Sequence, residues 1–349
     1  MKKVSIIGHF GGNENFFDGQ TVKTKNLKSL LENYGGLETY CVDTYLVRRH
    51  KFKLLFKSLW SLVKCKNIVI LLSKNGMNLY LPFLYYANKL FRRRIFHDII
   101  GSELVTMTKE NPKLVKYLNA LEKNWFEYES GAKVLRELGV NNVEVLPNCK
   151  KLDAVKSDLI SPYFSSDDSY TFCTFSRVMR QKGITDAINS VAEINEKRGK
   201  IVARLDIYGP VEDDYKDELD ELTAKYSDFV SYCGVTDSHN SVQTLCEYYA
   251  LLFPTCWHGE GFPGTILDCY ASAIPVLASD WNANKEIIVH GKTGMIYPSE
   301  EVKTLTETIE WALDNKDKMD QMKHSCREEY EKYTPEHISG IICSAIVRE

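Results

Sequence analysis

The sequence predicts an α/β protein made of two doubly wound, Rossmann-like domains. Short apolar runs alternate with amphipathic stretches along the whole chain, as in parallel sheets whose two faces are covered by helices. The length of 349 residues suits two domains of similar size. A polar segment at 147–168, which contains Pro162 and a Ser-Ser-Asp-Asp run, is the expected linker between them.

The first half opens with an apolar run that ends in a glycine-containing loop, which predicts a buried strand and a turn. The next stretch predicts a helix that Gly35 and Gly36 close. Further apolar runs and amphipathic stretches follow in alternation. The expected strands are Val4–Gly8, Leu37–Val42, Asn67–Leu72, Arg94–Asp98, Trp125–Glu129 and Val143–Leu146, and the expected helices are Thr21–Tyr34, Leu79–Phe91, Asn111–Asn124 and Gly131–Leu138.

The second half repeats this alternation and predicts a second sheet of the same kind. Its expected strands are Tyr170–Phe175, Arg204–Tyr208, Phe229–Tyr232, Tyr249–Pro254 and Pro275–Ser279, and its expected helices are Thr185–Arg198, Asp214–Lys225 and Pro263–Ala273. In doubly wound folds, ligands bind beyond the carboxyl ends of the strands. The loops that follow strands are therefore the places where functional residues are expected.

Composition limits the class of protein. The formal net charge of −3 argues against a nucleic-acid packaging protein, although residues 1–150 carry +11 and the remainder −14. Ten cysteines without a C-x-x-C pair indicate buried thiols in a reducing compartment. The longest apolar run, Ile68–Leu72, is far shorter than a membrane span. A cytoplasmic protein is expected.

Two cations follow the first strand of the second domain. Arg177 and Lys182 lie in the loop after Phe175, where a forked guanidinium and a point-charge ammonium suit a diphosphate. Taken alone, the pattern is equally typical of surface cations that flank a turn glycine.

A second loop joins the strand ending at Pro254 to a helix expected to start near Pro263. Its glycines allow a ligand to approach the backbone, and the N–H groups at the helix start favour a phosphate. Glu260 lies just before the helix, and Asp268 lies in the helix, eight residues after Glu260. The two carboxylates are placed to meet hydroxyl groups on different parts of one ligand.

Together these two loops resemble the retaining GT-B glycosyltransferases of family 4, of the type that makes bacterial capsular and surface polysaccharides. Glu260 and Asp268 are similar to that family's pair of acidic residues, the second of which is usually Glu. The resemblance implies two Rossmann-like domains that face each other across a cleft. It implies an acceptor domain at 1–155, a donor domain at 156–334, and a C-terminal helix at about 335–349 that crosses back to the first domain.

The resemblance also implies the roles of the loop residues. Arg177 and Lys182 would bind the donor diphosphate, Glu260 would hold the donor sugar, and Asp268 would bind the ribose, less securely because Asp is one methylene shorter than Glu. The implied donor-binding residues are Arg177, Lys182, Gly209, Val235, Glu260, Gly261, Phe262, Pro263, Gly264, Thr265 and Asp268. Arg177, Lys182, Glu260 and His97 would be catalytic.

His97 ends an apolar strand of the first domain, where a lone histidine is by itself more typical of a packed residue. The resemblance places it at the interdomain cleft, beside the reacting carbon of the donor sugar. The same cleft would be lined from the first domain by Gly11, Gly12, Gly19, Gln20, Thr21, Gly101 and Ser102. The glycine spacing of the first loop does not fit a nicotinamide-binding fingerprint.

A basic run at 48–64 predicts an amphipathic helix. Phe52, Leu55, Phe56, Leu59, Trp60 and Val63 share one face at 100° per residue. Lys53, Lys57 and Lys64 line one edge of that face, beside Trp60. The pattern favours attachment to an anionic membrane surface, on the inner face of the cell membrane. A helix that buries this face in the core is the alternative.

The combined prediction is a retaining glycosyltransferase. It would move a hexose or N-acetylhexosamine from a nucleotide-diphosphate sugar, with UDP as the expected nucleotide, to a sugar or lipid-linked glycan. No Asp-x-Asp motif is present, so neither a metal nor another cofactor is expected, and neither is a nucleic-acid partner. A sugar-nucleotide epimerase on the same fold and a non-catalytic subunit that binds sugar nucleotides or nucleic acid are the alternatives.

Overall fold

A computed structural model describes residues 3–12, 19–45, 50–163, 165, 167–299 and 302–347. The chain divides into two compact units: unit 1 is Met1–Cys149 with Pro335–Glu349, and unit 2 is Lys150–Thr334. The sequence predicts the boundary after residue 155, and the structure has it after Cys149. Four residues of the predicted first loop and basic run lie outside the described residues: Asn13, Asp18, Arg48 and Arg49.

Unit 1 is built on a six-stranded parallel sheet with the order β2-β1-β3-β4-β5-β6. The direction of the strand order reverses between β1 and β3, which is the switch point of a flavodoxin-like arrangement. The strands are β1 (Lys3–Gly8), β2 (Glu38–Asp43), β3 (Asn67–Ile70), β4 (Arg94–Asp98), β5 (Lys123–Phe126) and β6 (Val143–Val145).

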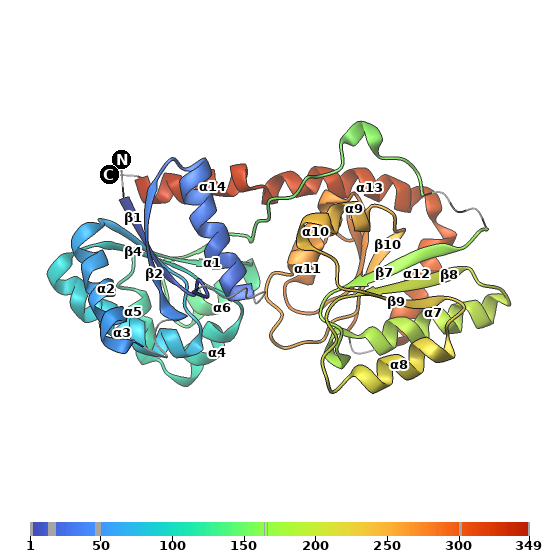
Figure 1. Ribbon diagram of the computed structural model, residues 1–349, viewed down its shortest axis with the longest axis horizontal. Helices are drawn as coiled ribbons and strands as arrows, with labels where there is room; N and C mark the ends of the chain where they lie inside the picture. The colour runs from blue at the N-terminus through green and yellow to red at the C-terminus, as the bar shows by residue number, and fades with distance from the viewer. Residues whose placement is uncertain are drawn as a thin grey trace. The chain divides into compact units, whose positions relative to one another are not determined.

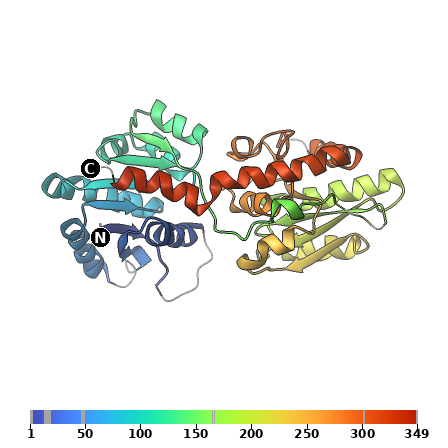
Figure 2. The same ribbon diagram turned by 90° about the horizontal axis from the view of Figure 1, so that it is seen from above.

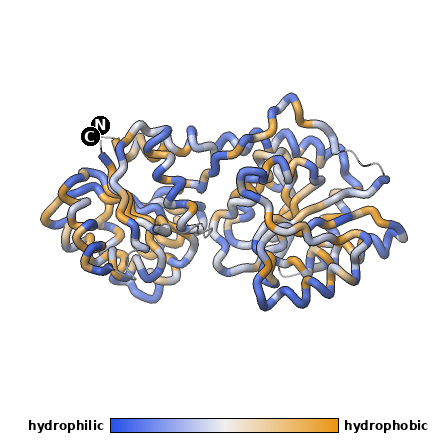
Figure 3. Tube along the Cα trace, in the orientation of Figure 1, coloured by the Kyte–Doolittle hydropathy of each residue, from blue (hydrophilic) through white to orange (hydrophobic). Residues whose placement is uncertain are grey.

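The central strands are apolar on both faces because helices cover both faces of the sheet. In β3, Ile68, Val69 and Ile70 are all fully buried. Figure 3 shows the hydrophobic residues, in orange, concentrated on the central strands of each unit. The covering helices of unit 1 are α1 (Gly19–Ser29), α2 (Lys51–Lys64), α3 (Lys74–Phe91), α4 (Glu103–Glu110), α5 (Lys113–Leu118), α6 (Glu129–Glu137) and α14 (Pro335–Val347).

One predicted helix of unit 1 is wrong. Instead of a single helix over Asn111–Asn124, α4 ends before Asn111, α5 begins after Pro112, and β5 begins at Lys123. Asn111 adopts φ −134° and ψ 86°, because the α conformation is disfavoured before proline. The predicted helix over Thr21–Tyr34 also changes character, since α1 is followed by a π-helical turn at Leu30–Tyr34.

The last helix of the chain completes the core of unit 1. Ile338, Ile342 and Ile346 of α14 are buried in the same apolar cluster as residues of β1 and α1. The Arg94 guanidinium donates hydrogen bonds to the carbonyl oxygens of Ala345 and Ile346, which caps the end of α14. Figures 1 and 2 show α14, in red, beside the blue elements of unit 1.

Unit 2 holds a second six-stranded parallel sheet, with the order β12-β11-β10-β7-β8-β9. This is the strand order of the dinucleotide-binding Rossmann fold, and its switch point lies between β7 and β10. The strands are β7 (Tyr170–Phe175), β8 (Ala203–Tyr208), β9 (Val230–Gly234), β10 (Ala250–Phe253), β11 (Val276–Ser279) and β12 (Gly294–Tyr297). The last of these strands was not among the predicted ones.

Two groups of helices cover the sheet of unit 2. Helix α7 contacts α8 and α12, whereas α10 contacts α9 and α13. Figure 1 shows α7 and α8 on the opposite side of the sheet from α9 and α10. The helices are α7 (Ile184–Arg198), α8 (Lys216–Lys225), α9 (Ser241–Leu245), α10 (Gly264–Ala271), α11 (Asn284–Ile287), α12 (Val302–Asp314) and α13 (Lys316–Tyr330), with short 3₁₀ turns at Ser157–Leu159, Arg180–Lys182, Ser238–Asn240 and Glu331–Tyr333.

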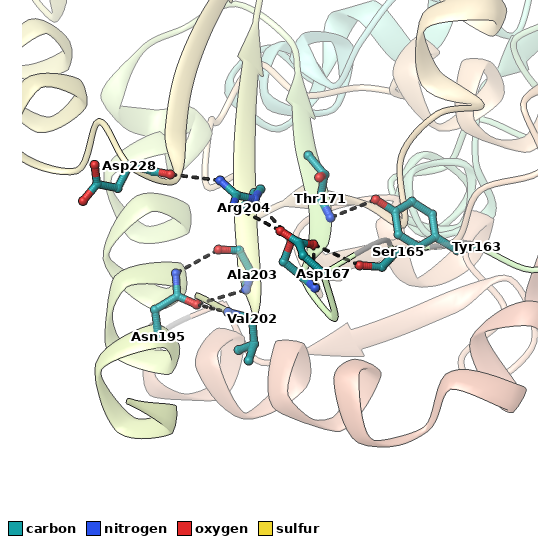
Figure 4. A network of polar contacts seen from close by, with 10 residues as sticks. Tyr163, Ser165, Asp167, Thr171, Asn195, Val202, Ala203, Arg204 and Asp228 are labelled. Atoms are coloured by element: carbon teal, nitrogen blue, oxygen red, sulfur yellow. Dashed lines mark hydrogen bonds and ion pairs between the residues drawn. The ribbon is translucent and has the colours of Figure 1, made fainter. Parts of the chain in front are cut away.

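The amino-terminal edge of this sheet is held by a network of polar side chains (Figure 4). Asn195 accepts hydrogen bonds from the backbone N–H groups of Val202 and Ala203 and donates one to the Ala203 carbonyl oxygen. Arg204 donates to the Asp228 carbonyl oxygen and contacts Asp167. These side chains satisfy backbone groups at the edge of the sheet where β7 and β8 begin.

None of the helices in the described ranges is both long and apolar enough to cross a bilayer.

Candidate functional site

A cavity of about 340 Å³ lies at the carboxyl ends of the strands of unit 2. It is placed at the switch point, where β7 and β10 lie next to each other. It is lined by Lys150, Phe175, Ser176, Arg177, Lys182, Tyr208, Gly209, Pro210, Val235, Thr236, Phe253, Trp257, Glu260, Pro263, Gly264, Thr265 and Asp268.

Closely apposed backbone joins the loops at and beside the cavity. Gly209 adopts φ +136°, and a Cβ atom there would lie 1.7 Å from the Ser176 carbonyl oxygen. Gly183 adopts φ +73°, and a Cβ atom there would lie 2.2 Å from the Pro254 carbonyl oxygen. Only glycine fits either position, so the loops after β7, β8 and β10 are held together at a fixed spacing.

Lys182 and Glu260 form a buried ion pair at the wall of the cavity, with exposed fractions of 6% for each residue. Thr255 also donates a hydrogen bond to the same Glu260 oxygen, at 3.1 Å. Burial lowers the pKa of Lys182, the Glu260 carboxylate opposes this shift, and the nearby Arg177 adds to it. Lys182 makes no other hydrogen bond within the described residues, so further N–H donors remain for a ligand.

Trp257 contacts both cations that the sequence places in the loop after β7. The Arg177 guanidinium lies 4.5 Å and the Lys182 ammonium 5.0 Å from the centre of a Trp257 ring. Such cation–π contacts stabilise both charges near an apolar surface. Arg177 is also 3.2 Å from Glu212, in a pair that is largely exposed. The ring therefore holds two cations on one wall of the cavity.

The start of α10 supplies backbone donors. Pro263 is the residue before the helix, in an extended conformation with ψ 115°, and the helix begins at Gly264. The prediction that Pro263 is the first helical residue is therefore off by one position. The Thr265 hydroxyl is buried and has no hydrogen-bond partner among the described residues. An anion at this helix start would meet both the backbone N–H groups and this hydroxyl.

Asp268 lies deeper along α10 and is 2% exposed. The Lys150 ammonium lies 2.6 Å and 2.7 Å from its two carboxylate oxygens, and the Ser241 hydroxyl donates to Oδ1 at 2.6 Å. Burial raises the pKa of Asp268, and Lys150 and Ser241 oppose that shift. Sequence reasoning predicted Asp268 as a ribose ligand and missed Lys150.

The cavity gathers nine of the eleven predicted donor-binding residues. The two others lie elsewhere: Gly261 is not part of the lining, and Phe262 is buried against the ring of Tyr333, with ring centres 5.5 Å apart. Trp257 lies in the same loop as Glu260, but its position in the sequence does not indicate that its ring contacts Arg177 and Lys182.

The predicted cleft residues of unit 1 lie in two loops and the first turn of a helix. Gly11 and Gly12 follow β1 with positive φ angles, and Gly12 N–H donates to Asp43 at 2.8 Å. Gly19, Gln20 and Thr21 form the first turn of α1, with Gly19 exposed and Thr21 buried 2.7 Å from His9. Gly101 and Ser102 precede α4. Whether these residues meet a donor stays a prediction.

His97 has no exposed surface. Neither ring nitrogen makes a hydrogen bond of normal geometry within the described residues. Burial lowers the pKa of His97 to about 4, the Lys23 charge adds to this shift, and Asn124 opposes it. The residue lies opposite Asn124 of β5 in the sheet. Its predicted contact with a donor sugar stays a prediction.

Beside His97 lies a buried ionic cluster that sequence reasoning did not find. The Lys23 ammonium is 2.8 Å from Asp98 Oδ1, 2.9 Å from Glu127 Oε1 and 2.8 Å from the Ile99 carbonyl oxygen. The two carboxylates raise the pKa of Lys23 although burial works in the opposite direction. The cluster joins the ends of β4 and β5 to α1.

The apolar face of α2 points to solvent. The described part of the predicted basic helix runs over Lys51–Lys64, and Phe52, Phe56 and Trp60 are 88%, 67% and 41% exposed. Lys53 and Lys64 are exposed and Lys57 is half-buried. The helix instead buries a different stripe: Leu54, Ser58, Ser61 and Leu62. The alternative that the predicted apolar face packs in the core is therefore wrong.

The sequence model of the family described as "Glycosyl transferases group 1" matches residues 156–329. Unit 2 carries a glycosyl transferases group 1 domain. All of the residues that line the cavity, except Lys150, lie inside the matched segment.

Similarity to individual proteins agrees with this assignment. The chain is 25% identical over 167 residues to the capsular polysaccharide biosynthesis glycosyltransferase CapM of Staphylococcus aureus, which is 47% of this chain and 42% of CapM. The chain thus spans less than half the length of this curated relative.

Two solved structures share the fold over nearly the whole chain. Anabaena Alr3699/HepE in complex with UDP and glucose has a TM-score of 0.70 at 13% identity, covering 99% of this chain and all of that one. The lipopolysaccharide outer core galactosyltransferase WaaB in its apo form has a TM-score of 0.70 at 14% identity, covering 99% of each chain. The two six-stranded parallel sheets are those of a GT-B glycosyltransferase fold.

Within the ranges that the structure describes, no three His, Cys, Asp or Glu side chains come together in a way that could hold a metal ion. The charged side chains at the cavity instead occur as cation–carboxylate pairs: Lys182 with Glu260, Arg177 with Glu212, and Lys150 with Asp268.

Proposed function

We propose that this chain is a retaining glycosyltransferase that moves a hexose or N-acetylhexosamine from a UDP-sugar to a sugar or lipid-linked glycan, in the synthesis of a capsular or other surface polysaccharide. The observation that carries the proposal is the cavity of the group 1 domain, where two cations and a helix start with an unpaired threonine hydroxyl converge. The naming of CapM as a capsular enzyme and the UDP complex of HepE support the choice of pathway and nucleotide.

Each wall of the cavity has a role in this proposal. Lys182, Arg177 and the backbone N–H groups at the start of α10 bind the diphosphate, and Glu260 binds hydroxyl groups of the donor sugar. Burial lowers the pKa of Lys182, and its pairing with Glu260 opposes this shift and so favours the charged form. The same pair holds the Glu260 carboxylate in place beside the sugar.

The reaction breaks the bond between the anomeric carbon and the β-phosphate oxygen, and forms a bond from that carbon to an acceptor hydroxyl oxygen. The acceptor proton passes to the departing phosphate oxygen, so no carboxylate nucleophile is needed. Negative charge develops on the diphosphate, and donors fixed before the reaction lower its energy most effectively in a water-poor site. No metal takes part, so we expect EDTA to leave the rate unchanged.

A thermal-shift screen with UDP, GDP, ADP and CMP tests the donor class, because a ligand of the native state raises the unfolding midpoint. We expect stabilisation by UDP. Transfer from UDP-sugars to a glycan acceptor, with the product anomer read by NMR, then tests the reaction. Stabilisation by none of the nucleotides would sink the proposal, and net conversion of the donor to another sugar without acceptor would favour an epimerase.

The acceptor side of the proposal includes an anionic membrane, which the chain would meet through α2 at the cytoplasmic face. Six apolar side chains of α2 are exposed: Phe52, Leu55, Phe56, Leu59, Trp60 and Val63. The Lys64 ammonium lies 5.2 Å from the Trp60 ring, so a cation borders this apolar face. Residues 1–150 carry a net charge of +11, which complements anionic lipid headgroups.

Vesicle sedimentation tests whether the exposed face of α2 binds an anionic membrane or another partner. We expect binding to vesicles with phosphatidylglycerol and little binding to phosphatidylcholine alone. Replacing Lys53, Lys57 and Lys64 by Gln should weaken binding about 100-fold, at about 1 kcal/mol per lysine. A matched variant with Gln at the exposed Lys197, Lys200 and Lys303 should bind normally. Binding unaffected by the α2 changes, or a concentration-dependent dimer in place of binding, would overturn the membrane proposal.

A further inference from the structure

Lys150 is the one residue of the cavity wall that lies outside the matched group 1 segment. It is the first residue of unit 2, and its backbone is fixed because the Tyr330 hydroxyl donates to its carbonyl oxygen at 2.7 Å. Its side chain is 27% exposed, whereas that of its partner Asp268 is 3% exposed. The ammonium group therefore lies between a buried carboxylate and the cavity.

The hydrogen bonds of this pair leave one donor and one acceptor unused. Lys150 uses at most two of its three N–H groups on Asp268, and the structure gives it no other acceptor among the described residues. Asp268 Oδ1 already accepts from both Lys150 and Ser241, whereas Oδ2 accepts from Lys150 alone. Each carboxylate oxygen takes about two hydrogen bonds, so Oδ2 can take one more.

We propose that Lys150 is a second ligand of the donor ribose: beside Asp268, whose ribose contact the family resemblance implies, Lys150 donates to one hydroxyl of the vicinal 2′,3′-diol while Asp268 Oδ2 accepts from the other. This inference rests on the proposed function. An adjacent N–H donor and carboxylate acceptor match a vicinal diol, in which one hydroxyl accepts while the other donates. The shorter Asp side chain is thereby supplemented by a lysine that reaches further into the cavity.

A phosphate is a poorer occupant of this position. The charge of Lys150 is already balanced by the Asp268 carboxylate within 2.7 Å, which would repel a second anion. The start of α10 lies only four residues before Asp268, about 6 Å along the helix axis. A phosphate at Gly264 and Thr265 therefore leaves the attached ribose within reach of Lys150 and Asp268.

Binding of UDP, 2′-deoxy-UDP and 3′-deoxy-UDP, measured by calorimetry, tests the inference. We expect the wild-type chain to bind UDP about tenfold more tightly than either deoxy compound, because each loses a hydrogen bond to a charged group. Lys150→Met should weaken binding of UDP and of one deoxy compound about tenfold, and should leave binding of the other, which lacks the hydroxyl that Lys150 contacts, within twofold of wild type. Discrimination against that second compound would then disappear, whereas discrimination through Asp268 would remain.

Lys151→Met is the matched control, since Lys151 is exposed and does not line the cavity. Because Lys150→Met leaves a buried carboxylate unpaired, the uncharged double variant Lys150→Met, Asp268→Asn is measured as well. The ratio of UDP to deoxy-UDP affinity does not depend on how much protein is folded. If Lys150→Met keeps the tenfold ratio for both deoxy compounds, or loses all three ligands equally, the inference is overturned and the proposed function stays intact. A wild-type chain that binds no UDP would overturn both.

Discussion

The two units place a lysine in an ionic cluster at the carboxyl edge of a parallel sheet, but the two lysines differ in what their N–H groups contact. In unit 1, Lys23 has three oxygen atoms within 2.9 Å: it donates hydrogen bonds to Glu127 and the Ile99 carbonyl and forms an ion pair with Asp98. In unit 2, Lys182 has one oxygen partner, Glu260, and otherwise faces the aromatic rings of Trp257 and Phe253.

This difference separates a structural cluster from a ligand-binding one. An ammonium has three donors, and a site in which all of them already have acceptors offers a ligand nothing. A lysine with unused donors at the wall of a cavity is instead ready for oxygen atoms of a substrate. Burial alone does not distinguish the two, because the Lys182 side chain is 7% exposed and that of Lys23 is 11% exposed.

The largest expected effect is on stability in unit 1. Lys23→Met leaves Asp98 and Glu127 buried without their cation, which should lower the free energy of unfolding by about 3–5 kcal/mol. Urea unfolding measures this change, with the exposed Lys25→Met as the control. UDP binding by the folded protein should stay within twofold of wild type. A loss of UDP affinity without a loss of stability would break the comparison.

The next effect is on activity in unit 2. Lys182→Met removes a preorganised donor to the diphosphate, so kcat/KM should fall by about 10²–10³-fold. Lys197→Met is the matched control, because this exposed lysine on α7 also pairs with a carboxylate, that of Glu310, but lies outside the cavity. Undiminished transfer by Lys182→Met would show that the unused N–H donors of Lys182 do not bind the diphosphate.

The pH dependence of the free energy of unfolding tests whether His97 of unit 1 is buried. His97 has a pKa of about 4 in the folded chain, below the usual 6.5. As the pH falls from 6.5 to 4, the unfolded chain takes up a proton that the folded chain does not, so stability falls by about 3 kcal/mol by pH 4. Above pH 6.5 the residue contributes nothing.

Urea unfolding of wild type and His97→Gln at pH 7 and pH 4.5 measures how much of the loss of stability comes from His97. The variant should lose less stability on acidification than wild type. His324→Gln, at an exposed position, should behave like wild type. Equal acid sensitivity of wild type and His97→Gln would show that His97 is accessible, as its predicted role at a donor sugar requires.

The smallest expected effect concerns the exposed pair of unit 2. Arg177 and Glu212 are 3.2 Å apart, with side chains 44% and 42% exposed. Glu212→Gln should change stability by less than about 0.5 kcal/mol, because solvent screens such pairs. It should tighten UDP binding about two- to fivefold, since it frees Arg177 for the diphosphate. The control is Glu310→Gln. Weaker UDP binding would mean that Glu212 positions Arg177 rather than competing for it.

Much of the fold could be predicted from local patterns. Continuous apolar runs gave the two parallel sheets, because strands buried on both faces need no alternation. The loop residues Arg177, Lys182 and Glu260 were found because each follows a predicted strand, and the structure brings all three to one cavity. The strand β12 was missed, since Gly294–Tyr297 is short and only partly apolar.

The rest depends on contacts that spacing does not encode. Lys150 meets Asp268 across 118 positions of sequence, and no local feature links them. In α2, the helical period showed which residues share a face but not which face is buried. The buried stripe looks polar in the sequence because it contains Ser58 and Ser61. Their hydroxyls donate to backbone carbonyls within the helix, so these side chains pack like small apolar ones.

The position of α14 has a consequence for how the protein is made. The core of unit 1 includes Ile338, Ile342 and Ile346, which the ribosome delivers only after all of unit 2. Unit 2 is contiguous in the chain and can fold as soon as it emerges. The nascent first 149 residues must wait with an uncovered apolar surface, so the unit synthesised first is completed last. Chaperone binding during translation is therefore expected to concentrate on unit 1.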